Sequence, residues 1–163
     1  MSNKNKDRGK YFENQISEKI RLFLNIKKKD LHRNFESGNA KIEYGDIYLP
    51  FNCVIECKYH KSWTFNTLMK ENKQIKDWIQ QLDDAVAKYI KDNDLIPLKS
   101  LIISKPYENI YVFLDYEFLN NLNLLPKFYI KHNDLIVVLF DQYLDILKDF
   151  IRIEQLKINS LGE

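Results

Sequence analysis

The stretch "YGDIYLPFNCVIECKYH", residues 44–60, constrains the fold more than any other part of the chain. It contains two short apolar runs joined by a bend at "LPFN", which predicts a β-hairpin with strands at about 44–49 and 53–59. Side chains alternate between two faces along a strand. One face of the second strand is apolar and suits a protein core, whereas the opposite face carries Glu56 and Lys58. A buried strand does not normally hold such charges.

The register of this hairpin brings two carboxylates together. Pairing Ile47 with Ile55 keeps apolar side chains opposite each other and places Asp46 opposite Glu56. Like charges directly opposite each other destabilise a sheet, and a single ammonium group, that of Lys58, does not neutralise both. Hard oxygen ligands with open water positions suit Mg²⁺. The hairpin therefore indicates a divalent-metal site.

The remaining chain predicts an α/β protein. Apolar residues at helical spacing predict helices, and apolar runs bounded by turn residues predict strands. The expected helices cover about residues 6–26, 67–91, 117–123 and 141–156. The expected strands cover 31–37, 44–49, 53–59, 98–105, 109–116 and one segment within 128–140. This order predicts a mixed sheet flanked by helices, and the length favours a single domain over 1–163.

Composition excludes several other classes of protein. Four Gly and four Pro argue against disorder, and no apolar run reaches the roughly 18 residues of a membrane span. The charged start "MSNKNKDRGK" lacks the apolar core of a signal peptide, so we expect a cytoplasmic protein. Cys53 and Cys57 lie too far apart on one strand for a disulfide. With no companion thiols or paired histidines, they suit a buried role better than a zinc site.

These residues resemble the PD-(D/E)xK nuclease superfamily. Gly45-Asp46 is followed after nine residues by Glu56-Cys57-Lys58, with Glu13 upstream on the first helix. Within the superfamily, the chain is most similar to archaeal-type and phage Holliday-junction resolvases. The similar motifs are "RGKYFE", "ESG" (36–38), "IECKYHKSW" and the helical "QQLDDA", which contains Gln81. The resemblance covers about residues 8–115.

The chain also departs from that pattern. Gly45 replaces the proline of the motif name, the loop around Ser37 has fewer glycines than in many resolvases, and the part beyond about 117 matches nothing in them. The spacing Glu-x-Lys is itself unspecific, because ten Glu and 21 Lys yield roughly one copy by chance. Glu71-Asn72-Lys73 is such a second copy, in a polar helical stretch. The alternative to a nuclease site is a structural ion cluster.

The resemblance implies a restriction-endonuclease-like α-β-β-β-α-β core at about 6–116, with a strand and helix extension at about 117–163. It implies that Glu13, Asp46 and Glu56 hold one or two Mg²⁺ ions, for which Mn²⁺ can substitute, helped by the backbone carbonyl of Cys57. Lys58 would position or help deprotonate the attacking water and neutralise developing charge. Gln81 would orient the site from the long helix.

Basic residues near the proposed site suggest a polyanion partner. Residues 1–41 hold eleven Lys or Arg against five Asp or Glu, whereas 110–163 hold five against eight. The candidates for phosphate contacts are Arg8, Lys10, Arg33, Ser37 and Lys61. Each basic candidate can equally be an ordinary solvated surface residue. The run Lys27–Lys29 is more typical of a helix end.

Three further residues have weaker functional interpretations. His60 follows the motif directly, but a lone histidine at a strand end seldom carries a proton or a phosphate. Trp78 fits the apolar side of its helix and is expected in the core. For Trp63, the sequence does not decide between stacking on bases and packing in the core.

The expected function is a Mg²⁺-dependent, structure-selective DNA endonuclease that resolves four-way junctions as a homodimer, in a bacterial or phage-infected cell. One alternative is a restriction- or repair-type nuclease on the same fold, acting on linear duplex or flap DNA. Another is a nucleic-acid-binding domain without catalysis, whose signature would be loss of Asp46, Glu56 or Lys58.

Overall fold

A computed structural model describes residues 3–33, 44–61, 63–70 and 72–160 of the chain. Its helices are α1 (Asn3–Leu24), α2 (Phe65–Met69), α3 (Lys73–Asn93), α4 (Tyr116–Asn121) and α5 (Phe140–Ser160). Its strands are β1 (His32–Arg33), β2 (Ile47–Tyr48), β3 (Cys53–Tyr59), β4 (Leu98–Ser104), β5 (Tyr111–Asp115), β6 (Ile130–His132) and β7 (Leu135–Leu139). The predicted α/β class is confirmed.

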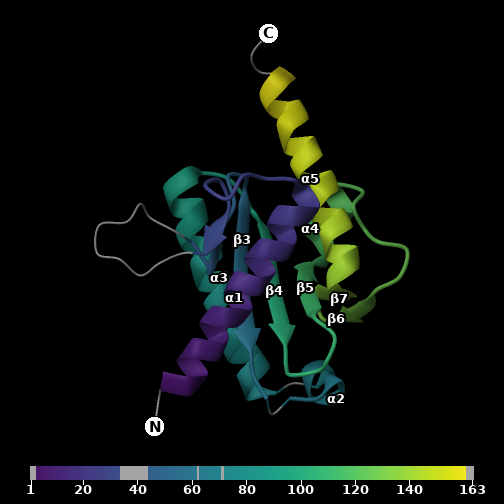
Figure 1. The fold of residues 1–163 in the computed structure, drawn as a ribbon. Coiled ribbons are helices and arrows are strands. Elements are labelled where there is room, and N and C mark those ends of the chain that lie inside the picture. Colours follow the sequence, from purple (N-terminus) through teal and green to yellow (C-terminus); the bar gives the residue numbers. More distant parts are fainter. Residues whose placement is uncertain (1–2, 34–43, 62, 71, 161–163) are drawn as a thin grey trace.

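The described strands form one sheet in the order β1-β2-β3-β4-β5-β7-β6. Every neighbouring pair is antiparallel except β3 and β4, which are parallel. Parallel neighbours need a crossover connection, and α2 and α3 supply it. Helices α1, α4 and α5 cover one face of the sheet and α3 covers part of the other (Figure 1). This is the mixed sheet flanked by helices that the sequence predicts.

Strand β3 divides its side chains between two cores, as the alternation predicts. Cys53, Ile55 and Cys57 pack in the core under α1 and α5. Val54 packs on the opposite face in the core under α3. Both thiols are free and buried, and burial raises the pKa of each well above its ordinary value. They are therefore inert packing groups.

Both tryptophans belong to the core under α3. Trp78 lies on the buried side of α3, as predicted. Trp63 is also buried, and its Nε1–H donates to the backbone oxygen of Ser104 at 3.4 Å. Its role, open from sequence, is thus packing rather than stacking on a base.

Two predicted elements are divided in the structure. The helix expected at 67–91 is split into α2 and α3, because Lys70 is extended and Asn72 caps α3 by accepting from the Gln74 N–H. The strand expected within 128–140 is a hairpin of β6 and β7, with Asn133 at a φ of 53° between them.

Two other predictions fall partly outside the described residues. Of the strand expected at 31–37, the structure describes only His32–Arg33 as a strand, so the "ESG" loop lies outside the described residues.

None of the helices in the described part of the chain combines the length and the apolar character needed to cross a membrane.

Candidate active site

Strand β3 presents Glu56 and Lys58 side by side on the face that α3 covers. Their side chains are 13% and 20% exposed, and the Lys58 Nζ lies 2.6 Å from the Glu56 Oε1. Charge-assisted hydrogen bonds of this length are among the stronger polar contacts in proteins. Lys58 therefore neutralises the charge of Glu56, and the charge of Asp46, the other carboxylate of the predicted pair, needs a different partner.

Asp46 reaches β3 by a route that the sequence did not predict. Ile47 pairs with Ile55, as expected, but the antiparallel ladder contains only that pair. The Asp46 N–H donates to the Ile55 oxygen at 2.7 Å, and its Oδ2 accepts from the Cys57 N–H at 2.7 Å. The predicted ladder pair of Asp46 with Glu56 is replaced by a side chain that caps a backbone amide of β3.

Glu13 approaches the same place from α1. Its neighbour Phe12 is buried and packs against Tyr59 at the end of β3, with ring centroids 5.4 Å apart. Glu13 is half-buried and close enough to raise the pKa of both Asp46 and Cys57. The structure thus brings three predicted carboxylates together near Glu56 and Cys57 of β3, from three separate segments.

These carboxylates leave the site short of positive charge. Burial, then Glu56, then Glu13 raise the pKa of Asp46 from 3.8 to about 7, against the opposing effects of the Cys57 N–H and Lys58. Carboxylate oxygens are the ligands that Mg²⁺ prefers, so the donor set fits that ion. Within the described residues, no three acidic, histidine or cysteine side chains already form a closed metal centre. Asp46 and Glu56 each have a second carboxylate oxygen that could bind the ion while the first oxygen keeps its present contact.

Two contacts of α3 show where Gln81 lies along β3. Tyr89 donates to Asn52 just before β3, and the Trp78 ring lies 6.0 Å from the ring of His60 just after it. Gln81 falls between these two levels and is exposed. Its predicted orienting role stays a prediction.

The other predicted residues divide into two groups. Arg8 and Lys10 are exposed on α1 before Glu13, and Lys61 is exposed just beyond β3, so all three lie at the end of the sheet that holds the site (Figure 1). The Lys27–Lys29 run follows the far end of α1, where Leu24 lies roughly 16 Å along the helix axis from Glu13. Ser37 and the side chain of Arg33 lie outside the described residues.

Sequence analysis missed one support of the site. Tyr44 precedes the Gly45-Asp46 pair, and its hydroxyl donates to the Asp92 Oδ2 at 2.7 Å. Its ring also meets the ring of Tyr89 at a centroid distance of 4.9 Å. These contacts fasten the segment that carries Asp46 to α3. No local pattern signals them, because the hydrogen-bonded residues are 48 positions apart.

Replacing Asp46 by Asn is expected to stabilise the metal-free protein at pH 8. Because its pKa is raised from 3.8 to about 7, the folded state binds more protons than the unfolded chain between those values. The free energy of unfolding therefore falls as pH rises through that window. Asn removes the charge and keeps an oxygen for the Cys57 N–H. Thermal unfolding in chelator should show a gain of roughly 5–10 °C at pH 8 and almost none at pH 4. An equal gain at both pH values would contradict this account.

Comparison with protein families identifies a family that matches almost the whole chain. A family model described as "Phage putative PDDEXK endonuclease" matches residues 4–159. The comparisons with curated proteins and with solved structures gave no match. The matched range contains all three carboxylates and Lys58, and it continues through most of the part beyond 117 that resembled nothing in the resolvases.

Proposed function

This chain belongs to the phage PDDEXK endonuclease family, and from that premise we propose that it hydrolyses DNA phosphodiester bonds with the aid of Mg²⁺. The observation that carries the proposal is the convergence of Asp46, Glu56 and Lys58 along the second half of β3, with Glu13 beside them. A structural ion cluster would be expected to balance its charge. Here burial is the main cause of the raised pKa of Asp46, and the neighbouring carboxylates of Glu56 and Glu13 raise it further, so a divalent ion would offset the negative charge gathered there.

Each residue has a distinct role in this proposal. Asp46 and Glu56, with Glu13 and the Cys57 carbonyl, would hold the ion, and Mn²⁺ can replace Mg²⁺. When bound, the ion supplies charge stabilisation at the phosphate and lowers the pKa of a bound water. Lys58 holds its ammonium group within hydrogen-bond reach of Glu56, so it can orient the attacking water and offset negative charge. Gln81 would help to orient that water from α3.

The end of the sheet that holds the site also suits a DNA backbone. Arg8, Lys10 and Lys61 are exposed there, and lysine and arginine contacts with phosphates position a duplex without reading its sequence. Arg33 and Ser37 are proposed as further phosphate contacts. These residues would set the orientation of the strand that is cut.

We further propose that the substrate is branched DNA, with the four-way junction as the first case, and that the chain acts as a homodimer. The support is the similarity of "RGKYFE" and "IECKYHKSW" to resolvase motifs. Two symmetric sites would make the paired nicks that junction resolution requires. Retention of Asp46, Glu56 and Lys58 argues against a domain that binds DNA without cutting it.

A cleavage assay tests this function. Purified protein is incubated with a labelled four-way junction, a matched linear duplex, a flap and a single strand, each with Mg²⁺ or with chelator. We expect symmetric nicks in the junction, lost in chelator and in the Glu56→Gln variant because an ion ligand is then absent. Cutting of linear duplex at an equal rate would retain the site and reject the substrate. Binding without cutting under Mg²⁺ and Mn²⁺ would reject catalysis.

A further inference from the structure

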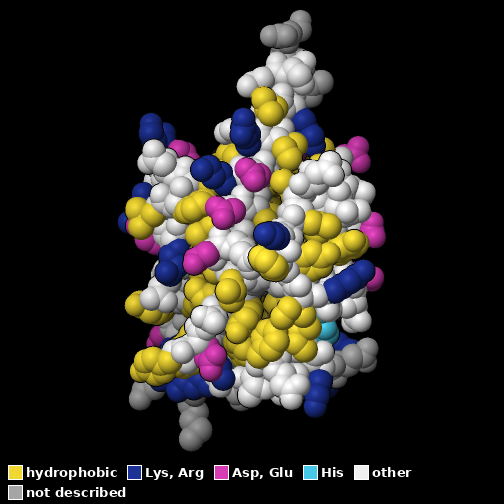
Figure 2. All heavy atoms as spheres, turned by 90° about the vertical axis from the view of Figure 1, so that its right-hand side faces the viewer, with side chains coloured by type: hydrophobic (Ala, Val, Ile, Leu, Met, Phe, Trp, Pro, Cys, Tyr) yellow, Lys and Arg dark blue, Asp and Glu magenta, His cyan; other side chains and the backbone are white. Residues whose placement is uncertain are grey.

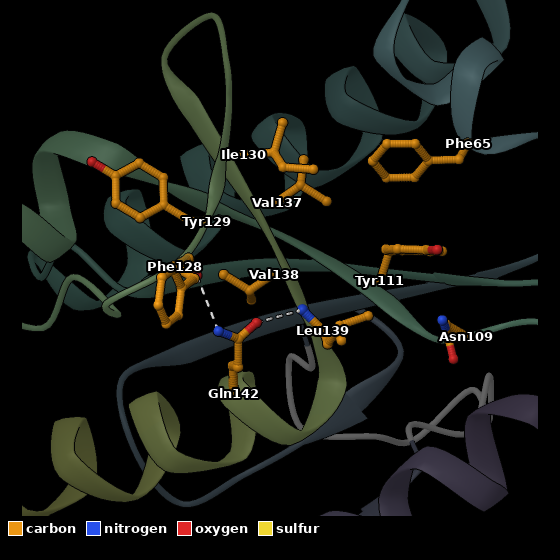
Figure 3. Close-up of a pocket in the computed structure, with 10 residues that line it drawn as sticks. All are labelled: Phe65, Asn109, Tyr111, Phe128, Tyr129, Ile130, Val137, Val138, Leu139 and Gln142. Carbon is orange, nitrogen blue, oxygen red and sulfur yellow. Dashed lines mark hydrogen bonds between the residues drawn. The ribbon is translucent and has the colours of Figure 1, made fainter.

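An apolar pocket of about 430 Å³ lies beside the candidate active site and has no part in the proposed chemistry. It is open to solvent and of a size typical of ligand sites. Phe65 from α2 and Tyr111 from β5 lie on one side of it, and Phe128 and Tyr129 lie on the other (Figure 3). Gln142 holds the base of the pocket by donating to the Phe128 oxygen and accepting from the Leu139 N–H.

The register of the sheet ties this pocket to the site. Lys58 on β3 pairs with Ile103 on β4, Ile103 pairs with Tyr111 on β5, and Tyr111 pairs with Leu139 on β7. Directly paired residues point to the same face of a sheet, so these four side chains form one row. Tyr111 lies two strand spacings from β3, on the order of 10 Å. A DNA strand with a phosphate at Lys58 would therefore reach the pocket within a few nucleotides.

Aromatic rings connect the pocket with the end of β3. The Phe65 ring lies 5.1 Å from the Tyr111 ring, and Tyr111 lies 5.9 Å from the buried Trp63. Phe65 is held at the start of α2 by a capping box, in which Thr64 and Thr67 exchange hydrogen bonds with each other's backbone. These contacts fix a half-exposed aromatic ring next to the site, where it can stack without first being ordered.

The surface around the pocket combines apolar side chains with lysines. Figure 2 shows hydrophobic side chains gathered in the lower half of this side of the molecule. Phe128 is 70% exposed, and Ile130 and Leu139 are each 45% exposed. The Lys105 Nζ lies 5.5 Å above the Trp63 ring, and the Lys127 Nζ lies 5.3 Å above the Phe128 ring. Lys105 also pairs with Glu108 at 3.3 Å.

This combination identifies one kind of ligand. Rings that accept a stacked base, with cations at two borders that accept phosphates, are the features by which proteins bind single-stranded nucleic acid. A second copy of the chain pairing along β6 is a poorer fit. That edge strand has three residues and carries Lys131, and short edges with a central lysine oppose such pairing.

We propose that the pocket at Phe65 and Tyr111 binds an unpaired base of the DNA strand that is cut at Lys58. The inference rests on the proposed function and specifies its substrate, which is DNA with an unstacked or single-stranded nucleotide close to the cleavage point. A stacked base would lie against Phe65, and Lys105 would contact a phosphate on the path to the site. A fully stacked linear duplex offers no base to this pocket and is bound only through its backbone.

Binding without cleavage tests the proposal. Glu56→Gln protein in chelator is titrated with a labelled oligothymidine and with a blunt hairpin duplex. Phe65→Ala should weaken binding of the single strand about 5- to 150-fold and leave the hairpin within about twofold. Phe23→Ala is the matched control, because Phe23 is also an exposed phenylalanine (42% against 36%) but lies near the far end of α1. Equal loss in both variants, or no loss in Phe65→Ala, would overturn the proposal.

A pair of charge variants identifies the occupant and covers the case in which Phe65→Ala fails to fold. Leu139→Glu should weaken single-strand binding, because it places a carboxylate beside the phosphates, whereas Leu139→Lys should preserve or strengthen it. Loss of binding in both variants, or a dimer that both of them dissociate, would indicate an apolar partner and overturn the proposal. Single-strand binding that depends on Phe65, without cleavage of any DNA, would support the base-binding pocket and reject both the proposed function and the link of the pocket to cleavage.

Discussion

Lys58→Met protein is expected to cut its DNA substrate about 10²- to 10³-fold more slowly than the unchanged protein. The ammonium group lies 2.6 Å from Glu56 and lowers the pKa of Asp46. Methionine keeps most of the length of the side chain but supplies neither a charge nor a donor. Among the described residues, Lys58 is the one lysine that lowers the pKa of Asp46, and the variant removes it. Single-turnover cleavage of a labelled junction with saturating Mg²⁺ measures the loss directly.

Lys99 provides a closely matched control for that experiment. It lies on the adjacent strand β4, on the same face of the sheet, and its side chain is 21% exposed against 20% for Lys58. It pairs with Asp83 at 3.0 Å and with Asp115 at 3.5 Å. Lys99→Met should therefore cost comparable stability and leave the cleavage rate within about threefold. Equal loss of cleavage in both variants would mean that the lysines act through the fold, and Lys58 would lose its proposed role in catalysis.

The side-chain faces of β3 could be predicted because they depend on a short-range rule. Alternation along one strand separates the apolar Ile55 from the charged Glu56 wherever the strand lies. Pairing of Ile47 with Ile55 follows from the same pattern, since a shift of one residue would bury charges. The identity of the charged pair and the core beneath it therefore required no knowledge of the remaining chain.

The position of Asp46 could not be predicted in this way. Its contact with the Cys57 N–H depends on where the ladder stops, and the link from Tyr44 to Asp92 depends on how α3 crosses the sheet. Both are long-range features without a local pattern. The break before α3 and the turn at Asn133 are different cases. An asparagine stands at each, as N-cap and as turn residue, so a local signal was present.

The glycine at position 45 shows how one departure from the motif supports the site. A proline there would fix φ near −65°, whereas Gly45 has a φ of 72°. It also approaches β3 so closely that an added Cβ would lie 2.4 Å from the Ile55 oxygen. The chain needs this approach because Asp46, the next residue, must place its side chain on the Cys57 amide. Gly45 therefore has a mechanical role in placing the carboxylate.

Gly45→Ala is accordingly expected to lower the free energy of unfolding by about 2–4 kcal/mol, from the positive φ and the backbone clash together. It should also slow cleavage about 100-fold, because a shift of roughly 1 Å in a catalytic group has effects of that size. Gly9→Ala is the control. A Cβ at Gly9 on α1 meets only the Glu13 Oε1 at 3.9 Å, and alanine in a helix should add about 0.5–1 kcal/mol. Denaturant unfolding and single-turnover cleavage measure both quantities for each variant. Equal unfolding free energies and equal cleavage rates for Gly45→Ala and Gly9→Ala would contradict this prediction. Gly45 would then not be needed for the close approach to β3 or for the placement of Asp46.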